Sequence, residues 1–220
     1  MTECVIKLIA ADDFTLDAFR VTPENPKGGL VVLQEIFGVG EQLKSVARRF
    51  AELGFDTIAP ALFDRVSPNT IIPFEDVNRG RETMLKLNID EVMLDVAAAV
   101  KQVESGNGVT VLGFCWGGGM AMRAAGQLKL AGAVSYYGTS LNIHTRNGTK
   151  CPTLFHFGET DSLVAPEIIE AVKQAIADAE IYTYAAGHAF ANEARSSYVP
   201  EAATQAWERT AAFLNKVHNA

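Results

Sequence analysis

The sequence predicts an α/β fold with a mainly parallel central sheet and helices on both faces. Short apolar runs recur along the chain, and segments with the apolar spacing of an amphipathic helix separate them. The runs are rich in β-branched residues, which is typical of strands buried on both faces. Such an alternation of strand and helix favours parallel strands joined by helical crossovers.

The alternation begins at residues 28–33 (GGLVVL), which we interpret as a buried strand. Apolar spacing over 41–53 then predicts a helix, and 55–59 (FDTIA) predicts a second strand. The Pro-rich stretch 61–74 predicts an irregular loop over the edge of the sheet.

The remaining predicted elements continue this alternation to the end of the chain. They are helices over 79–87 and 89–103, a strand over 109–114, a helix over 117–128, strands over 130–137 and 153–157, a helix over 166–179, a strand over 181–184 and a helix over 201–217. The sequence contains no repeat, linker or low-complexity segment between them. We therefore expect a single domain over residues 1–220.

Composition narrows the classes of partner and compartment. A net charge of -7 argues against a nucleic-acid partner, which would require a basic face. The three cysteines, Cys4, Cys115 and Cys151, cannot all pair and show no metal-type spacing to histidine, which favours a reducing compartment. The N-terminus lacks the features of a signal peptide, and no apolar run approaches the roughly 20 residues that span a bilayer. We expect a cytoplasmic protein that does not bind membranes, and a monomer because no segment resembles an obligate interface.

The strongest motif is 113–118 (GFCWGG), which joins a predicted strand to a predicted helix. A residue on such a tight turn projects into the crevice at the carboxyl end of the sheet, and small flanking residues let strand and helix approach closely. Cys115 occupies the turn, where the dipole of the following helix favours the reactive thiolate. A buried structural cysteine beside a Gly-rich turn would give the same pattern.

Two further strand ends carry an acid and a base. Asp161 follows the strand 153–157 and His188 follows the strand 181–184, so the order nucleophile, acid, base matches that of α/β-hydrolases. His188 would take the thiol proton, and Asp161 would fix the tautomer of the imidazole. Glu159 is the rival acid, although it comes sooner after its strand.

The other histidines lack this context. His156 lies inside a predicted strand and is expected to be a hydrogen-bonded core side chain. His218 falls in the C-terminal tail, and His144 follows no predicted strand directly.

A second motif, 34–38 (QEIFG), follows the first buried strand. The α/β-hydrolase fold draws one amide of its oxyanion hole from this loop, so we expect the backbone N–H groups of Ile36 and Trp116 to form the pair. Glu35 would then lie near Cys115, where low polarity favours a protonated carboxyl group. A solvated glutamate at a strand end is the alternative.

Together these residues resemble the dienelactone hydrolase (carboxymethylenebutenolidase) family of the α/β-hydrolase fold. The resemblance covers nearly the whole chain and rests on 34–38, 113–118, 136–138 (YYG), 155–158 (FHFG) with Asp161, and 187–191 (GHAFA). It implies a Cys115–His188–Asp161 triad in which the thiol rests neutral against Glu35 until substrate binding lets the carboxylate take its proton. It also implies hydrolysis of dienelactone, a small lactone bearing a carboxylate, to maleylacetate, with no cofactor and no metal.

The substrate-binding candidates are Arg81, Tyr137, Phe37 and Asn192. The resemblance implies an arginine near position 81, which Arg81 or the neighbouring Arg79 would supply, and a second one after the histidine motif. Asn192 stands where that second arginine is expected, and Arg195 comes three residues later. A neutral amide binds a carboxylate more weakly than a guanidinium does, so the departure puts specificity for a carboxylated lactone in question.

Three hypotheses follow from the sequence. The first is a cysteine hydrolase of small lactones or esters. The second is an enzyme of the same fold acting on a different acyl group, such as a thioester or an uncharged ester. The third is a non-catalytic binding module or thiol redox sensor.

Overall fold

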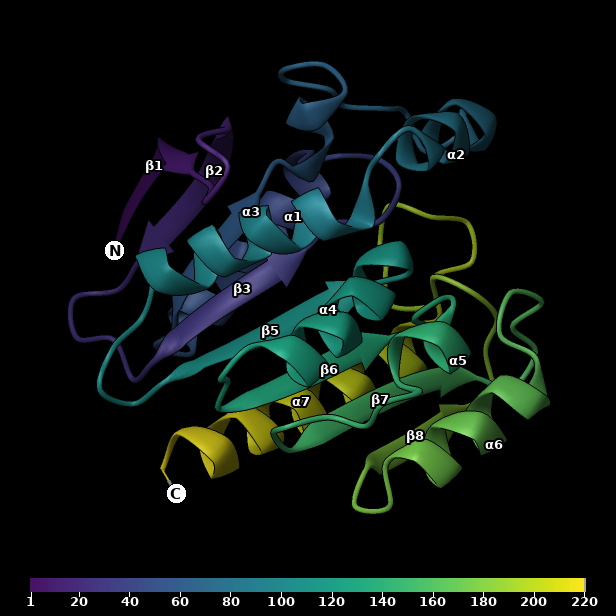
Figure 1. Cartoon of the computed structure of the whole chain (residues 1–220). Coiled ribbons are helices and arrows are strands. Elements are labelled where there is room, and N and C mark those ends of the chain that lie inside the picture. Colours follow the sequence, from purple (N-terminus) through teal and green to yellow (C-terminus); the bar gives the residue numbers. More distant parts are fainter. Residues whose placement is uncertain (220) are drawn as a thin grey trace. The chain divides into compact units, whose positions relative to one another are not determined.

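The computed structural model describes residues 1–219 and divides into two compact units, Met1–Val109 and Thr110–Ala220 (Figure 1). Each unit contains strands covered by helices, so the predicted α/β class is confirmed. A single domain over residues 1–220 stays a prediction.

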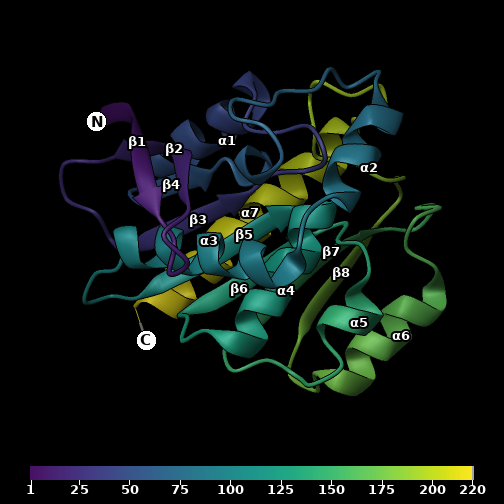
Figure 2. The same cartoon turned by 45° about the horizontal axis from the view of Figure 1, so that its top comes forward.

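The first unit contains four strands and three α-helices. They are β1 (Thr2–Ile9), β2 (Thr15–Thr22), β3 (Gly29–Leu33), α1 (Glu41–Glu52), β4 (Asp56–Pro60), α2 (Val77–Leu85) and α3 (Ile89–Gln102), with a 3-10 helix η1 at Leu62–Arg65. The strand order is β1-β2-β4-β3, in which β3 and β4 are parallel and the other two pairs antiparallel. Figure 2 shows α1 and α3 on opposite sides of β3 and β4.

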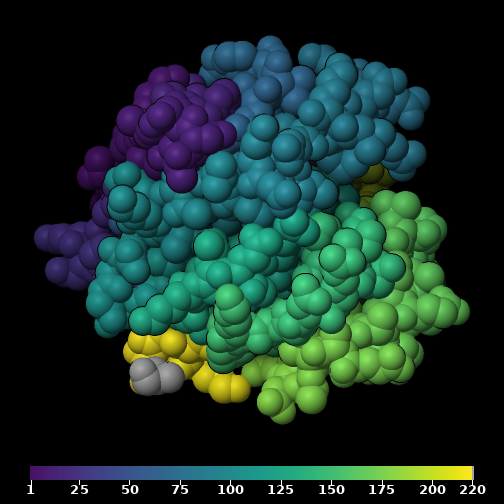
Figure 3. Space-filling model, in the orientation of Figure 1, coloured from purple at the N-terminus to yellow at the C-terminus, as the bar shows by residue number. Residues whose placement is uncertain are grey.

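The hairpin of β1 and β2 was not predicted from the sequence. Its first strand is almost entirely exposed (purple in Figure 3), and Val5 and Ile9 point their apolar side chains outward. A strand with this exposure carries no clean alternation of apolar and polar residues, and that alternation is the main sequence signal for a half-buried strand. The predicted strands at 28–33 and 55–59 are confirmed as β3 and β4.

The segment 61–74 is more ordered than the predicted loop. It begins with η1, and the carboxylate of Asp64 accepts hydrogen bonds from the backbone N–H groups of Asp17 and Asn69, each at 2.9 Å. Farther along, the N–H of Ile72 donates to the carbonyl of Phe37 at 2.9 Å. These bonds attach the segment to β2 and to the loop after β3.

The second unit has four parallel strands in the order β5-β6-β7-β8. Its elements are β5 (Val109–Phe114), α4 (Trp116–Gln127), β6 (Gly132–Tyr136), α5 (Leu141–His144), β7 (Thr153–Gly158), α6 (Pro166–Ala175), β8 (Glu180–Tyr184) and α7 (Pro200–His218). In Figure 2, α4 and α7 lie on opposite sides of β5 and β6.

Three details of the second unit differ from the predictions. The helix predicted to reach 179 ends at Ala175 because Ile176 takes an extended conformation (φ -135°). The short α5 was missed because its four residues are too few to show a period. His218 belongs to α7 rather than to a loose tail, and its Nε2 lies 3.0 Å from the hydroxyl of Thr110.

Candidate active site

Cys115 sits at the bend between β5 and α4, as predicted. Its backbone angles (φ 53°, ψ -119°) lie in a region that residues with a side chain rarely adopt, at a cost of about 1–3 kcal/mol. A Cβ atom on Gly113 would come within 2.0 Å of the carbonyl oxygen of Gly117, so the strand and the helix approach as closely as the motif required. The cysteine itself is buried, with 8% of its surface exposed.

Backbone hydrogen bonds hold this bend on both sides. The N–H of Cys115 donates to the carbonyl of Tyr136 at 3.0 Å. The carbonyl of Cys115 accepts from the N–H groups of Gly118 at 3.0 Å and Thr139 at 3.1 Å. The nucleophile candidate is therefore fixed to the end of β6 as well as to its own helix.

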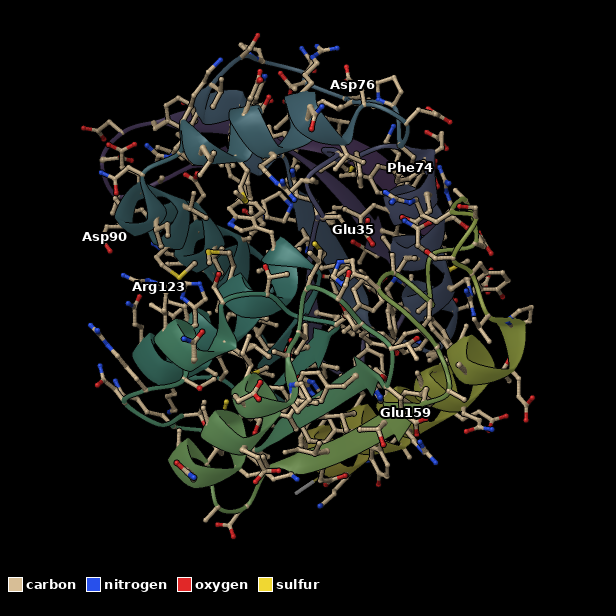
Figure 4. The ribbon with its side chains drawn as sticks, turned by 90° about the vertical axis from the view of Figure 1, so that its right-hand side faces the viewer. Glu35, Phe74, Asp76, Asp90, Arg123 and Glu159 are labelled. Atoms are coloured by element: carbon tan, nitrogen blue, oxygen red, sulfur yellow. The ribbon has the colours of Figure 1, made fainter. Side chains whose placement is uncertain are left out.

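Asp161 and His188 form a pair at the ends of β7 and β8. The Oδ2 atom of Asp161 lies 2.8 Å from Nδ1 of His188, and its Oδ1 accepts a hydrogen bond from the N–H of Leu163 at 2.8 Å. Asp161 is buried, whereas its rival Glu159 is exposed (Figure 4). The structure thus places Asp161, and not Glu159, beside the imidazole.

This pairing determines where the proton of a neutral His188 lies. A carboxylate only accepts hydrogen bonds, so Nδ1 carries the proton and Nε2 is left as the basic nitrogen. Nε2 is buried and has no hydrogen-bond partner within residues 1–219. The Cys115 thiol therefore does not donate a hydrogen bond to His188 in this structure, although a thiol–imidazole contact is what the motif led us to expect.

Aromatic rings surround the imidazole. The ring of Tyr137 meets His188 edge to face at 5.1 Å between centroids, and Phe190 meets Tyr137 in the same way at 5.5 Å. Tyr137 is completely buried and has a positive φ of 39°. Of the substrate-binding candidates, Tyr137 thus lies directly against His188.

Asn192 is also buried, with 1% of its surface exposed. Its side-chain carbonyl accepts a hydrogen bond from the N–H of Ala194 at 3.0 Å. Its Nδ2 has no hydrogen-bond partner among residues 1–219. An amide donor with an unused hydrogen thus stands two residues after Phe190, where the resemblance implied an arginine.

The remaining candidates belong to the first unit. Glu35 comes two residues after the end of β3 and is buried, with 7% of its surface exposed (Figure 4). The ring of Phe37 packs against Phe74 with centroids 4.8 Å apart. Gly80 of α2 lies so close to the carbonyl of Ile36 that a Cβ atom there would meet it at 2.5 Å. The loop after β3 is therefore firmly packed beneath α2.

Arg79 and Arg81 flank Gly80 on α2, and both side chains are exposed. Their role, the oxyanion hole of Ile36 with Trp116, and the action of Glu35 on Cys115 stay predictions.

The buried His156 behaves as predicted. Its Nδ1 lies 2.8 Å from the hydroxyl of Tyr184 and its Nε2 lies 2.9 Å from the hydroxyl of Thr210. Burial lowers the pKa of His156 to about 3, and the charge of Arg209 adds to the effect, so this histidine is neutral at ordinary pH. Sequence reasoning missed Tyr184 and Thr210, and a histidine inside an apolar strand was the available signal that such partners exist.

No group of three or more His, Cys, Asp or Glu side chains in residues 1–219 is arranged to hold a metal ion. None of the helices formed by these residues is both long and apolar enough to pass through a membrane.

A strained cysteine elbow after a parallel strand, with a hydrogen-bonded Asp–His pair after two neighbouring strands, defines an α/β-hydrolase. Comparison with known proteins agrees. The model of the dienelactone hydrolase family matches residues 16–218. The chain belongs to this family and is an ester or lactone hydrolase.

Individual relatives are similar over most of their length. A carboxymethylenebutenolidase of Pseudomonas putida is 30% identical, covering 95% of this chain and 94% of that protein. A Saccharolobus solfataricus protein provisionally named a carboxymethylenebutenolidase is 32% identical, covering 94% of this chain and 96% of the relative. The structure of a provisionally named dienelactone hydrolase from Klebsiella pneumoniae superimposes with a TM-score of 0.84 at 28% identity, covering 98% and 99% of the two chains.

Proposed function

We propose that this enzyme hydrolyses small lactones or esters through a Cys115–His188–Asp161 triad. The observation that carries the proposal is the 2.8 Å pair of His188 and Asp161 in the same unit as the strained Cys115 elbow. The thiolate attacks the acyl carbon and the carbon–oxygen bond to the leaving alcohol breaks, which leaves an acyl-cysteine. Water then attacks this thioester, releases the acid and restores the thiol.

Glu35 and His188 move the protons. The proton that Glu35 takes from the thiol goes to the departing alkoxide. Nε2 of His188 then takes a proton from the attacking water and returns it to the cysteine sulfur, and Asp161 stabilises the imidazolium between these two events. The basic Nε2 is left available because Nδ1 is committed to Asp161. The backbone N–H groups of Ile36 and Trp116 receive the negative oxygen, each contributing on the order of 3 kcal/mol in comparable sites.

Glu35 acts as the switch that creates the thiolate. At rest the thiol is neutral and held by the carboxylate, and substrate binding allows Glu35 to accept its proton. The absence of a hydrogen bond from Cys115 to His188 Nε2, within residues 1–219, supports a resting thiol that is not yet engaged with the imidazole. A neutral resting thiol also resists oxidation.

The proposed substrate is a small lactone bearing a carboxylate, as the names of the relatives suggest, with dienelactone and its product maleylacetate as the reference pair. Arg81 is the proposed carboxylate ligand. Asn192 supports a second candidate, an uncharged ester or a thioester, because a buried amide with a free donor suits a carbonyl or hydroxyl better than a carboxylate. We further propose a monomer that acts in the cytoplasm, since its three free cysteines suit a reducing compartment.

The test is turnover of a dienelactone and of short p-nitrophenyl esters by Cys115→Ala and by the matched control Cys151→Ala. Cys151 is a half-buried thiol whose pKa burial raises to about 11, so its loss leaves the reaction intact. Cys115→Ala is expected to lower kcat by on the order of 10³-fold or more. Equal rates in the two variants would refute the triad and leave a binding or redox role for the thiol.

Glu35→Gln separates the switch from a structural role. If Glu35 moves a proton, activity falls sharply while the urea midpoint changes little. A comparable loss of both would show that the glutamate serves packing.

A further inference from the structure

A chain of neutral hydrogen bonds crosses the interior of the second unit. It joins the hydroxyl of Tyr184 to Nδ1 of His156 at 2.8 Å, and Nε2 of His156 to the hydroxyl of Thr210 at 2.9 Å. The Thr210 hydroxyl lies 2.6 Å from that of Tyr136, which in turn lies 3.1 Å from the carbonyl oxygen of Ala206. We call these four side chains, Tyr136, His156, Tyr184 and Thr210, the buried network.

The last acceptor fixes the direction of every proton in the buried network. A carbonyl cannot donate, so the single proton of the Tyr136 hydroxyl goes to Ala206. The Thr210 hydroxyl must then donate to Tyr136, and Nε2–H of His156 must donate to Thr210. Because His156 is neutral, its Nδ1 has no proton and accepts from Tyr184.

The outer end of the buried network is held by a cation. The guanidinium of Arg209 lies over the ring of Tyr182 at 4.1 Å and over the ring of Tyr184 at 5.2 Å. Its hydrogen bond to Tyr184 partly offsets burial, which is the larger effect and raises the pKa of that phenol. Tyr184 therefore stays protonated and remains a donor to His156.

Each strand residue of the buried network also supports a segment of the active site through its backbone carbonyl. The carbonyl of Tyr136 accepts the N–H of Cys115 at 3.0 Å. The carbonyl of His156 accepts the N–H of Tyr137, whose ring contacts His188, at 2.8 Å. The carbonyl of Tyr184 accepts the N–H of Glu159, at the start of the loop that bears Asp161, at 2.8 Å.

Aromatic contacts also connect the buried network to Tyr137. Tyr184 packs on Phe190 with centroids 5.0 Å apart, and Phe190 packs on Tyr137 at 5.5 Å. Tyr137 is thus held against His188 in two ways. Its N–H donates to the His156 carbonyl, and its ring packs on Phe190, which packs on Tyr184.

We propose that the buried network positions the triad, because it locks together the three strand ends that carry Cys115, Asp161 and His188. Its members touch neither substrate nor reacting atoms, so they are positioning residues. The proposal rests on the triad proposed above and deepens it. Misplacing a catalytic group by about 1 Å costs on the order of 100-fold in rate, so small shifts of strand register matter.

Two conservative substitutions break the buried network without emptying its volume. Thr210→Val removes only a hydroxyl, and Tyr184→Phe removes the donor to His156. Tyr182→Phe and Thr153→Val are the matched controls, because they remove hydroxyls from β8 and β7 that are not part of the buried network. The Thr153 hydroxyl has no hydrogen-bond partner among residues 1–219.

We expect Thr210→Val and Tyr184→Phe to lower kcat about tenfold with KM changed less than about twofold, and to shift the midpoints of the kcat/KM pH profile. The controls keep the wild-type profile. Loss of thermal stability with wild-type kcat and pH profile would show that the buried network is merely structural and would overturn the proposal.

Proton NMR provides a readout that does not depend on turnover. The proton on His188 Nδ1 reports the bond to Asp161, and the ring nitrogens of His156 report its tautomer. We expect the Nε2–H form of His156 in the wild type, and a changed His188 resonance in both network variants only. If the resonance moves while no ester or lactone is hydrolysed, the proposed function fails and the positioning role stands. If all four variants keep the wild-type resonance, the positioning role fails.

Discussion

Asp95 of the first unit and Asp161 of the second are both buried carboxylates, and they have very different partners. Asp95, in α3 of the first unit, has no exposed surface and receives two hydrogen bonds from Arg65, at 2.7 and 2.8 Å. Asp161 of the second unit is nearly as buried, but it faces the imidazole of His188. One partner is a permanent cation, and the other is the imidazole that we propose as the catalytic base.

The surroundings extend this difference. Arg65 also binds Asp12 at 2.8 Å and lies 3.4 Å from Glu91, so a set of charges ties η1 to α3 and to the turn between β1 and β2. In the second unit, the sequence from Thr110 to Gly158 contains no aspartate or glutamate, and its polar interior is the uncharged buried network. The first arrangement holds segments of the fold together through charges, whereas the second does so through neutral hydrogen bonds beside the proposed triad.

The largest expected effect tests this division at Asp161. Asp161→Asn is expected to lower kcat by on the order of 10³- to 10⁴-fold, because an amide can stabilise the wrong tautomer of His188 and cannot stabilise the imidazolium. The free energy of unfolding should change far less, by about 1 kcal/mol. Steady-state kinetics and urea unfolding of the same preparation measure both quantities.

Glu159→Gln is the matched control for Asp161, since it makes the same chemical change on an exposed side chain two residues away. It should retain wild-type kcat. If Glu159→Gln were the more damaging substitution, the rival acid would be the catalytic one.

The next largest effect is on stability and not on activity. Asp95→Asn leaves Arg65 buried without its main counter-charge, so we expect the free energy of unfolding to fall by about 3–5 kcal/mol. The kcat of the remaining folded enzyme should be unchanged. Urea unfolding and active-site titration with an alkylating agent measure these two outcomes.

Replacing both partners by apolar residues sharpens the test. The double variant Arg65→Met, Asp95→Leu should recover part of the lost stability, because it leaves no unpaired buried charge. A double variant that is less stable than Asp95→Asn would mean that the charges themselves, with Asp12 and Glu91, hold the first unit together.

The contrast between the active-site residues and the buried network also explains what could be predicted from the sequence. Cys115, Asp161 and His188 were predicted because each lies on the segment that leaves a strand, so a local pattern of residues marks it. The loop bearing Glu35 was found in the same way. These are short-range signals, and the parallel order of β5, β7 and β8 in the second unit brings the ends of these strands to one edge.

The buried network and the first hairpin had no such local signal. His156 meets Tyr184 and Thr210 across separations of 28 and 54 residues, which no spacing rule anticipates. Strand β1 was missed because Val5 and Ile9 face outward, so its pattern is not that of a half-buried strand. The absence of a hydrogen bond between Cys115 and His188 Nε2, within residues 1–219, could not be predicted from the motif, because a motif specifies backbone geometry but not the side-chain rotamer.

A smaller effect follows from the neutral interior of the second unit. His156 has a pKa of about 3 in the folded chain and close to 6.5 when unfolded, so between these values the unfolded chain binds more protons. The contribution of His156 to the free energy of unfolding is therefore fully present above pH 6.5. Below that pH the free energy of unfolding falls by about 1.4 kcal/mol per pH unit for this one histidine. His144, whose pKa burial lowers to about 4, acts in the same direction.

Urea unfolding at pH 7, 5.5 and 4.5 measures this slope. His156→Gln should flatten it, since glutamine binds no proton in either state. Identical slopes for the wild type and His156→Gln would mean that His156 is protonated in the folded chain, and the proton directions assigned to the buried network would then be wrong.

The smallest effect concerns an exposed charge of the first unit. Arg81 lies on the surface of α2, and exposed ion pairs contribute little, so Arg81→Ala should raise KM for a carboxylated lactone by up to about fivefold. KM for a neutral p-nitrophenyl ester should not change, because no carboxylate is lost from its binding. Arg79→Ala, on the other side of Gly80, makes the same change at the alternative arginine and should affect neither substrate. A rise in KM for the lactone in Arg79→Ala alone would make Arg79 the carboxylate ligand. If the lactone shows no preference over the neutral ester in the wild type and Arg81→Ala alters neither KM, the uncharged acyl substrate suggested by Asn192 becomes the better assignment.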